Sequence, residues 1–173
     1  VPVVAVPGER FIIRSYSPQI TIAGGLVLDN AARKHRHRDF AQVVQYLTDL
    51  QRASGSEGRI LTIVSNAGSS GLISSDLQAR TAMQKAPLTA AVDSNISAGT
   101  IVDCGGVFLP TPEFETLCLA AEFAIGKFHE REPLSKGITR EELRESAFSF
   151  LPNEVFQAVI SSIESDGKIV TDK

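Results

Sequence analysis

Two β-forming runs near the start of the chain constrain its fold more than any other feature. They cover Arg10–Ser15 and Ile20–Leu28, and the polar corner Tyr16-Ser17-Pro18-Gln19 separates them. Runs that are rich in β-branched and aromatic residues and bounded by turn formers predict strands. The pair Gly24-Gly25 in the second run predicts a bulge or a close approach of the backbone. We therefore expect the first thirty residues to form a β segment.

Composition excludes several classes of protein. A length of 173 residues allows one or two domains, and 43% hydrophobic residues are enough to bury a core. No run approaches the roughly 18 consecutive apolar residues of a membrane span. The start, Val1–Val6, lacks the basic segment and cleavage site of a signal peptide and is predicted to be a strand. We expect a soluble cytoplasmic protein, in which Cys104 and Cys118 are buried thiols.

After Asp29 the pattern becomes helical. An amphipathic helix is predicted to begin at Asp39, with its inward face formed by Phe40, Val43, Val44, Leu47 and Leu50. Residues 53–58 are turn formers and predict a loop. Three helices are then predicted around 60–64, 74–83 and 87–96, followed by a hairpin over 100–109 that turns at Cys104-Gly105-Gly106. Three helices followed by a hairpin are the plan of a winged helix.

The same plan is predicted a second time. Thr111 is expected to cap a helix that has Pro112 at its first position and that runs to Phe128. Thr139 begins a capping-box sequence, and Pro152 opens the next helix. Residues 166–170 are predicted to turn into a strand, and the sequence ends where the return strand of a wing is expected. The predicted fold is α+β and mostly helical, with a β-barrel remnant over 1–30, a first winged-helix module over 31–111 and a second, incomplete one over 112–173.

Three segments resemble a known family. Residues 7–29 resemble the end of the last β-barrel domain of elongation-factor-Tu-like translational GTPases, and most closely that of the selenocysteine-specific elongation factor. Phe128-His129-Glu130-Arg131-Glu132-Pro133-Leu134-Ser135-Lys136-Gly137, with Glu141-Glu142-Leu143-Arg144 after it, is similar to the start of the second winged helix of that factor. Asp166-Gly167-Lys168-Ile169-Val170 is similar to its last helix-to-strand turn. The resemblance implies that the chain is a piece of a larger protein.

The resemblance also implies a function. The parent protein would deliver selenocysteyl-tRNA, at the expense of GTP, to ribosomes paused at recoded UGA codons. In that family the farthest winged helix binds a hairpin in the messenger RNA, and the nearer ones are spacers. This chain would be a connector between the tRNA- and GTP-binding body and the hairpin-binding end. Selenocysteyl-tRNA, the mRNA hairpin and the ribosome would be reached through the parent, and GTP and Mg²⁺ are implied for the parent only.

No catalytic site is predicted within the chain. A translational GTPase needs a phosphate loop, but the motif G-x-x-x-x-G-K-S/T is absent from the sequence. Asp103-Cys104-Gly105-Gly106 fits the short D-x-x-G pattern of GTPases, and we interpret it as the turn of a wing hairpin. His35 and His37 would share a face in an extended segment, but their cationic neighbours oppose metal binding. We expect no enzyme activity, no metal and no cofactor in this chain.

The basic run over residues 33–38 contains the candidate RNA contacts, which are Arg33, Lys34, Arg36 and Arg38. Residues 1–38 contain six Lys or Arg against two acidic residues, a net +4, whereas residues 112–173 contain seven against twelve, a net −5. These cations would contact RNA phosphates, or they would form a solvated hinge and pair with acids across the joint. The predicted recognition helices, 87–95 and 152–165, contain no Lys or Arg, so weak or no binding of nucleic acid is expected through them.

Two other functions fit winged-helix patterning. One is a DNA-binding transcriptional regulator, against which the cation-free recognition helices argue. The other is a protein-docking module of a larger assembly, which the acidic second half of the chain would suit.

Overall fold

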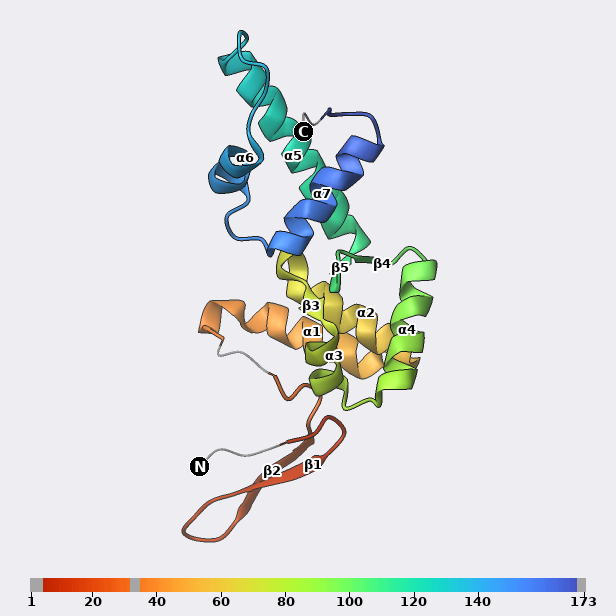
Figure 1. The fold of residues 1–173 in the computed structure, drawn as a ribbon. Coiled ribbons are helices and arrows are strands. Elements are labelled where there is room, and N and C mark those ends of the chain that lie inside the picture. The colour runs from red at the N-terminus through yellow and green to blue at the C-terminus, as the bar shows by residue number, and fades with distance from the viewer. Residues whose placement is uncertain (1–4, 32–34, 171–173) are drawn as a thin grey trace.

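The computed structural model of the protein describes residues 5–31 and 35–170. Figure 1 shows an elongated molecule, with a β-hairpin at one end, α1–α4 in the middle and α5–α7 at the other end. The predicted α+β, mostly helical fold is confirmed. The described elements are β1 (Arg10–Arg14), β2 (Thr21–Leu26), the 3-10 helix η1 (His37–Asp39), α1 (Phe40–Arg52), α2 (Gly55–Ala67), η2 (Gly68–Ser70), β3 (Leu72–Ile73), α3 (Ser74–Thr81), α4 (Lys85–Ser97), β4 (Ile101–Asp103), β5 (Val107–Pro110), α5 (Thr111–Arg131), α6 (Arg140–Ala147) and α7 (Asn153–Ser165).

The two predicted strands pair as an antiparallel hairpin. The register shifts between Ile13 and Arg14, so the bulge lies there, and Gly24-Gly25 shows the close approach that was the other alternative predicted for it. Gly25 pairs in register with Phe11, and a β-carbon on Gly25 would lie 2.6 Å from the Phe11 ring. The glycine therefore leaves room for an aromatic ring across the strand. Among the described residues no further strand joins this two-stranded sheet.

The middle of the molecule contains a winged helix. Helices α2, α3 and α4 surround a three-stranded antiparallel sheet in the order β3-β5-β4. Strand β3 was not predicted, because it consists of only Leu72 and Ile73 and becomes a strand by pairing with β5. Helix α1 precedes this unit and packs on α2. The core comprises the buried side chains of Leu50, Ile60, Ile63, Val64, Leu72, Leu77, Leu88, Ala91, Val92, Ile101 and Phe108.

Helices α5, α6 and α7 form a second unit with its own core. Most of its buried side chains come from these helices and from the segment between α6 and α7: Leu117, Ala121, Leu143, Phe148, Leu151, Val155, Phe156, Val159, Ile160 and Ile163. The strand predicted over residues 168–170 is not formed in the described part of the chain. Ile169 and Val170 have no strand partner there, and a strand requires a hydrogen-bonded neighbour.

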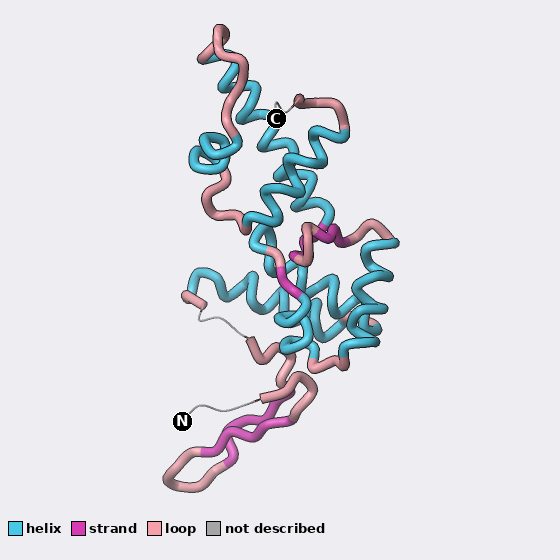
Figure 2. Tube along the Cα trace, in the orientation of Figure 1, coloured by secondary structure: helices cyan, strands magenta, loops and turns pink. Residues whose placement is uncertain are grey.

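Strand β5 contributes to both cores. Phe108 belongs to the core of the first unit, whereas Val107 and Leu109 belong to that of the second. Successive side chains of a strand point to opposite faces, so one short strand fills both cores. Figure 2 shows this strand at the junction between the two groups of helices. Bending the units apart would therefore expose apolar side chains in at least one core.

The helix predicted to begin at Asp39 is confirmed, but part of its predicted inward face is wrong. Phe40 and Val44 are 66% and 47% exposed. Both residues lie in the first two turns of α1, whose starting end extends away from the other helices in Figure 1. The inward face consists of the half-buried or buried Val43, Tyr46, Leu47 and Leu50.

Two further local predictions are corrected. The loop predicted over residues 53–58 is confined to Ala53 and Ser54, because the chain turns sharply from α1 at Gly55, whose φ is +71°, and α2 begins there. Thr111 was predicted as an N-cap but is the first residue of α5. Its hydroxyl donates a hydrogen bond to the Gly99 carbonyl at 2.7 Å instead. The N-cap predicted at Thr139 is confirmed, because its hydroxyl oxygen accepts from the Glu142 amide at 3.1 Å.

Candidate functional site

A buried polar cluster joins the hairpin to the first winged helix. Asp29 follows β2, and its side chain is only 3% exposed. One carboxylate oxygen accepts a hydrogen bond from the Tyr46 hydroxyl at 2.7 Å. The Arg80 guanidinium donates to both carboxylate oxygens, at 2.5 and 3.3 Å, and to the Tyr46 hydroxyl at 3.0 Å. Three side chains from the hairpin base, α1 and α3 are thus mutually bonded; we call them the joint cluster.

The joint cluster is ionic at neutral pH. Burial alone would raise the pKa of Asp29, but hydrogen bonds from Arg80, Tyr46 and the Ala31 amide outweigh burial and lower it. Burial and the neighbouring Asp29 carboxylate raise the pKa of Tyr46, so the hydroxyl stays protonated and donates. Burial opposes the charge of Arg80, but its hydrogen bond to Asp29 raises its pKa above the usual value. The cluster is therefore a buried ion pair with a neutral phenol attached.

Two contacts to the backbone reinforce the joint. The Arg59 guanidinium of α2 donates to the Leu28 carbonyl at 2.6 Å. The Asn30 side-chain amide donates to the Ala79 carbonyl of α3 at 3.0 Å. Residues 28–30 are therefore held by three helices at once. The sequence analysis missed this site, although Asp29 stands where the β pattern stops and Tyr46 lies on the inward face of its helix.

The predicted RNA-contact residues lie outside the joint cluster. Arg33 and Lys34 are outside the described residues. Arg36 and Arg38 are exposed, and Arg38 Nε lies 3.6 Å from the neighbouring Asp39 carboxylate. No ion pair among the described residues joins Arg36 or Arg38 to an acid across the joint. The hinge interpretation, in which arginines of this run pair with acids across the joint, stays a prediction, and the ion pair that the structure places at the joint is that of Arg80 with Asp29.

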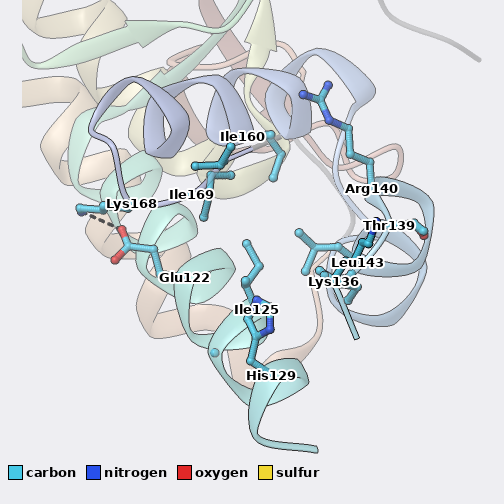
Figure 3. A pocket seen from close by; sticks show the side chains of 14 residues that line it. Glu122, Ile125, His129, Lys136, Thr139, Arg140, Leu143, Ile160, Lys168 and Ile169 are labelled. Atoms are coloured by element: carbon cyan, nitrogen blue, oxygen red, sulfur yellow. Dashed lines mark hydrogen bonds and ion pairs between the residues drawn. The ribbon is translucent and has the colours of Figure 1, made fainter. Parts of the chain in front are cut away.

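An open groove of about 490 Å³ lies between α5, α6 and the segment after α7. Figure 3 shows Ile125, Ile160 and Ile169 pointing into it. Two of the cations around it are in ion pairs, since Lys168 Nζ lies 2.7 Å from Glu122 and Arg140 lies 3.9 Å from Glu164. The hydrogen bond to Glu122 raises the pKa of Lys168. The groove thus has apolar side chains at its centre and charged side chains, Lys136 among them, at its rim.

The groove lies where strand β5 lies in the first winged helix, between the segments that flank the corresponding helices. There, β5 lies between β3, which directly precedes α3, and β4, which follows α4. In the second unit the groove lies between residues 136–138, which precede α6, and residues 168–170, which follow α7. Its apolar centre and these two flanking segments suit a strand, and the described residues that line it include no paired nucleophile and base.

The remaining chemical candidates are structural. Asp103 Oδ1 accepts a hydrogen bond from the Gly106 amide at 2.6 Å, within the turn of the β4–β5 hairpin, as the sequence predicted. Cys104 is buried, as predicted, and burial raises the pKa of its thiol to about 11. Cys118 is half-buried, and neither cysteine forms a disulfide. Within residues 5–31 and 35–170, no group of three or more His, Cys, Asp or Glu side chains is placed to hold a metal ion.

No helix in the described part of the chain is both long and apolar enough to cross a membrane.

The fold and its two helical units are those of a winged-helix protein, and comparisons with known proteins show what the chain is similar to. Residues 124–173 match a family model described as the winged helix of elongation factor SelB. A curated relative, the selenocysteine-specific elongation factor of Desulfomicrobium baculatum, is 29% identical over 154 residues. That alignment covers 82% of this chain and 22% of the relative, so the chain spans about a fifth of the relative's length. The two matches confirm the resemblance of this chain to a C-terminal part of the selenocysteine-specific elongation factor, SelB.

Proposed function

We propose that this chain is a stiff connector in a selenocysteine-specific elongation factor. It joins the body that binds GTP and tRNA to the end that binds the mRNA hairpin. The observation that carries the proposal is the joint cluster of Asp29, Tyr46 and Arg80, which fixes the hairpin on α1 and α3. A connector that holds two RNAs at a set separation must resist bending where its domains meet. A bidentate, buried ion pair resists bending because its geometry is directional and its separation leaves charges buried.

The shared strand extends this stiffness through the molecule. Since β5 contributes to both cores, the two winged helices are expected to move as one body. The division into a β segment over 1–30 and modules over 31–111 and 112–173 stays a prediction. The two separate clusters of buried residues support it, and β5 is the element that joins the modules.

The similarity to the curated relative supports a proposal for the activity of the whole factor. We propose that the parent protein is a cytoplasmic GTPase that delivers selenocysteyl-tRNA to the ribosome at recoded UGA codons. GTP and Mg²⁺ would bind in its body, and this chain would contribute no catalytic residue. The tRNA, the mRNA hairpin and the ribosome would be partners of the parent.

The two helices that would enter a DNA groove argue against the DNA-binding alternative. Helix α4 begins at Lys85, two residues earlier than predicted, and this lysine is its only cation. Helix α7 has none, and Glu154 in its first turn is exposed. Recognition helices usually need several cations, because phosphate contacts supply much of the affinity.

The connector role is tested by measuring a distance across the joint. Spin labels at Tyr16→Cys in the hairpin and Thr89→Cys on α4 would report the distance between the hairpin and the first winged helix. Cys118 would be replaced by Ser. Both labelled positions are exposed. We expect a single narrow distance distribution that broadens in Asp29→Asn and in Arg80→Gln. Arg38→Gln is the matched control and should leave the distribution narrow, since Arg38 makes no contact across the joint.

A broad distribution in the unsubstituted chain would contradict a stiff connector. A narrow distribution that persists in both joint variants would show that the stiffness has another source.

A further inference from the structure

The start of α1 presents an aromatic side chain among cations. Phe40 is 66% exposed, although large aromatic side chains normally bury most of their surface. His35, Arg36, His37 and Arg38 lie just before it, separated from it by Asp39, and all four are exposed. We call these five residues the basic aromatic surface.

The geometry of this surface leaves the ring accessible. The His37 ring lies nearly parallel to the Phe40 ring, with centroids 6.5 Å apart and an angle of 20° between the planes. This spacing is wider than that of a close stack, and Phe40 keeps two thirds of its surface exposed. A flat, exposed ring next to cations has the chemistry of a platform for a nucleobase.

The cations of this surface are not needed to hold the fold together. Arg80, Arg59 and Asn30 make the contacts that bind the hairpin base to the helices. Arg38 has only the adjacent Asp39 near it, with both side chains well exposed, and such a pair contributes little to stability. A structural role therefore does not account for these charges, whereas binding of an external anion would account for them.

We propose that the basic aromatic surface binds single-stranded RNA. Arg36 and Arg38 would contact phosphates, and Phe40 would stack on a base. The amide end of α1 adds a favourable field for the same anion. A lipid surface fits less well, because Gln42 and Gln45 follow Phe40 and Val44 is the only other large apolar side chain exposed on α1. This inference goes beyond the connector role, since a stiff connector need not bind RNA itself.

Binding to a fluorescently labelled single-stranded RNA of about ten nucleotides tests the proposal. Fluorescence polarisation of the whole 173-residue chain would be followed from about 50 to about 200 mM salt. We expect weak binding, with a dissociation constant of about 10⁻⁴ to 10⁻⁶ M that rises with salt. An RNA duplex without loops should bind less well, because its bases are not available for stacking.

Variants distinguish the proposed phosphate contacts from the proposed stacking of Phe40 on a base. Arg36→Gln/Arg38→Gln should reduce the slope of log affinity against log salt by about 1.4, since each phosphate contact to a single strand contributes about 0.7. Phe40→Leu keeps an apolar side chain and removes the ring, so it should lower affinity about fivefold or more at constant salt slope. Lys127→Gln/Arg131→Gln removes the same charge from exposed positions on α5 and should leave binding almost unchanged. Circular dichroism would confirm that each variant is folded.

Three results would overturn the proposal. One is the absence of RNA binding at about 50 mM salt. The second is binding that the Arg36/Arg38 and Phe40 variants leave unchanged, or that the α5 control reduces equally. The third is binding to vesicles of phosphatidylcholine and phosphatidylglycerol without binding to the RNA, which would make the surface a membrane contact. None of these results bears on the distance across the joint, so the connector role would stand or fall separately.

Discussion

At the scale of single residues, Asp29, Tyr46 and Arg80 attach the hairpin to the first winged helix. Replacing Asp29 by Ala would leave the largely buried Arg80 charge without its anion, and we expect a loss of about 3 kcal/mol in the free energy of unfolding. Tyr46→Phe removes one hydrogen-bonding hydroxyl and should cost about 1 kcal/mol. The double variant Asp29→Ala/Arg80→Met should lose less than the sum of its single losses, because neither charge is then left alone. Urea unfolding measures all of these values. Additive losses would mean that the two side chains act independently.

The same residues predict how stability depends on pH. The pKa of Asp29 is lowered in the folded chain from its usual value of 3.8. A lowered carboxyl pKa stabilises the fold above the unfolded-state value, and this stabilisation is lost as the pH falls below that value. The stability difference between the unsubstituted chain and Asp29→Asn should therefore be constant near neutral pH and shrink below about pH 4. Urea midpoints for both proteins across this range provide the measurement. A difference that stays constant in acid would mean that Asp29 is not ionised in the joint.

At the scale of elements, β5 is the strand on which the two winged helices depend. Phe108→Ala should destabilise the first core by about 3–5 kcal/mol, and Leu109→Ala the second by about 2–5 kcal/mol. Hydrogen exchange should show faster opening of α2–α4 in the first variant and of α5–α7 in the second. Both variants should also speed exchange in the β4–β5 hairpin, since the strand is common to the two cores. Opening confined to α2–α4 in both variants would contradict a shared strand.

The sequence predicted elements where local chemistry decides the structure. The helix over Arg140–Ala147 has its Thr139 cap, and the hairpin over 100–109 has its Gly-Gly turn. Strand β3 could not be predicted, because Leu72 becomes a strand residue only by pairing with Phe108 far along the chain. The exposure of Phe40 could not be predicted either, because the periodicity of α1 does not show where its neighbouring helices end.

The joint cluster was missed for the same reason. Asp29 is 17 residues from Tyr46 and 51 residues from Arg80 in the sequence. No local pattern pairs residues over such separations, and the basic run close to the joint drew the sequence analysis toward ion pairs nearer in the chain. Sequence reasoning located the hairpin and the helical units, whereas their mode of attachment required the structure.

At the scale of the whole molecule, the hairpin is the part that is most expected to contact another domain. All residues of β1 and β2 are exposed, and apolar side chains lie on both faces of the pair, with Phe11 and Ile13 on one and Ile12 and Leu26 on the other. Exposed apolar surface of this kind marks a contact site. In the proposed parent, the remaining strands of a barrel would cover it. The joint cluster would then transmit the orientation of that barrel to the winged helices.

The most direct measurement is selenocysteine insertion by the full-length factor that carries joint variants. Insertion at a UGA codon would be compared with GTP hydrolysis and selenocysteyl-tRNA binding in Asp29→Asn, in Arg80→Gln and in the control Lys127→Gln, which changes an exposed residue of α5 outside the joint. A stiff connector predicts that both joint variants lower insertion several-fold, while hydrolysis and tRNA binding stay unchanged. Normal insertion by joint variants whose inter-label distance has broadened would contradict the proposal that this chain works by holding the two ends of the factor at a fixed separation.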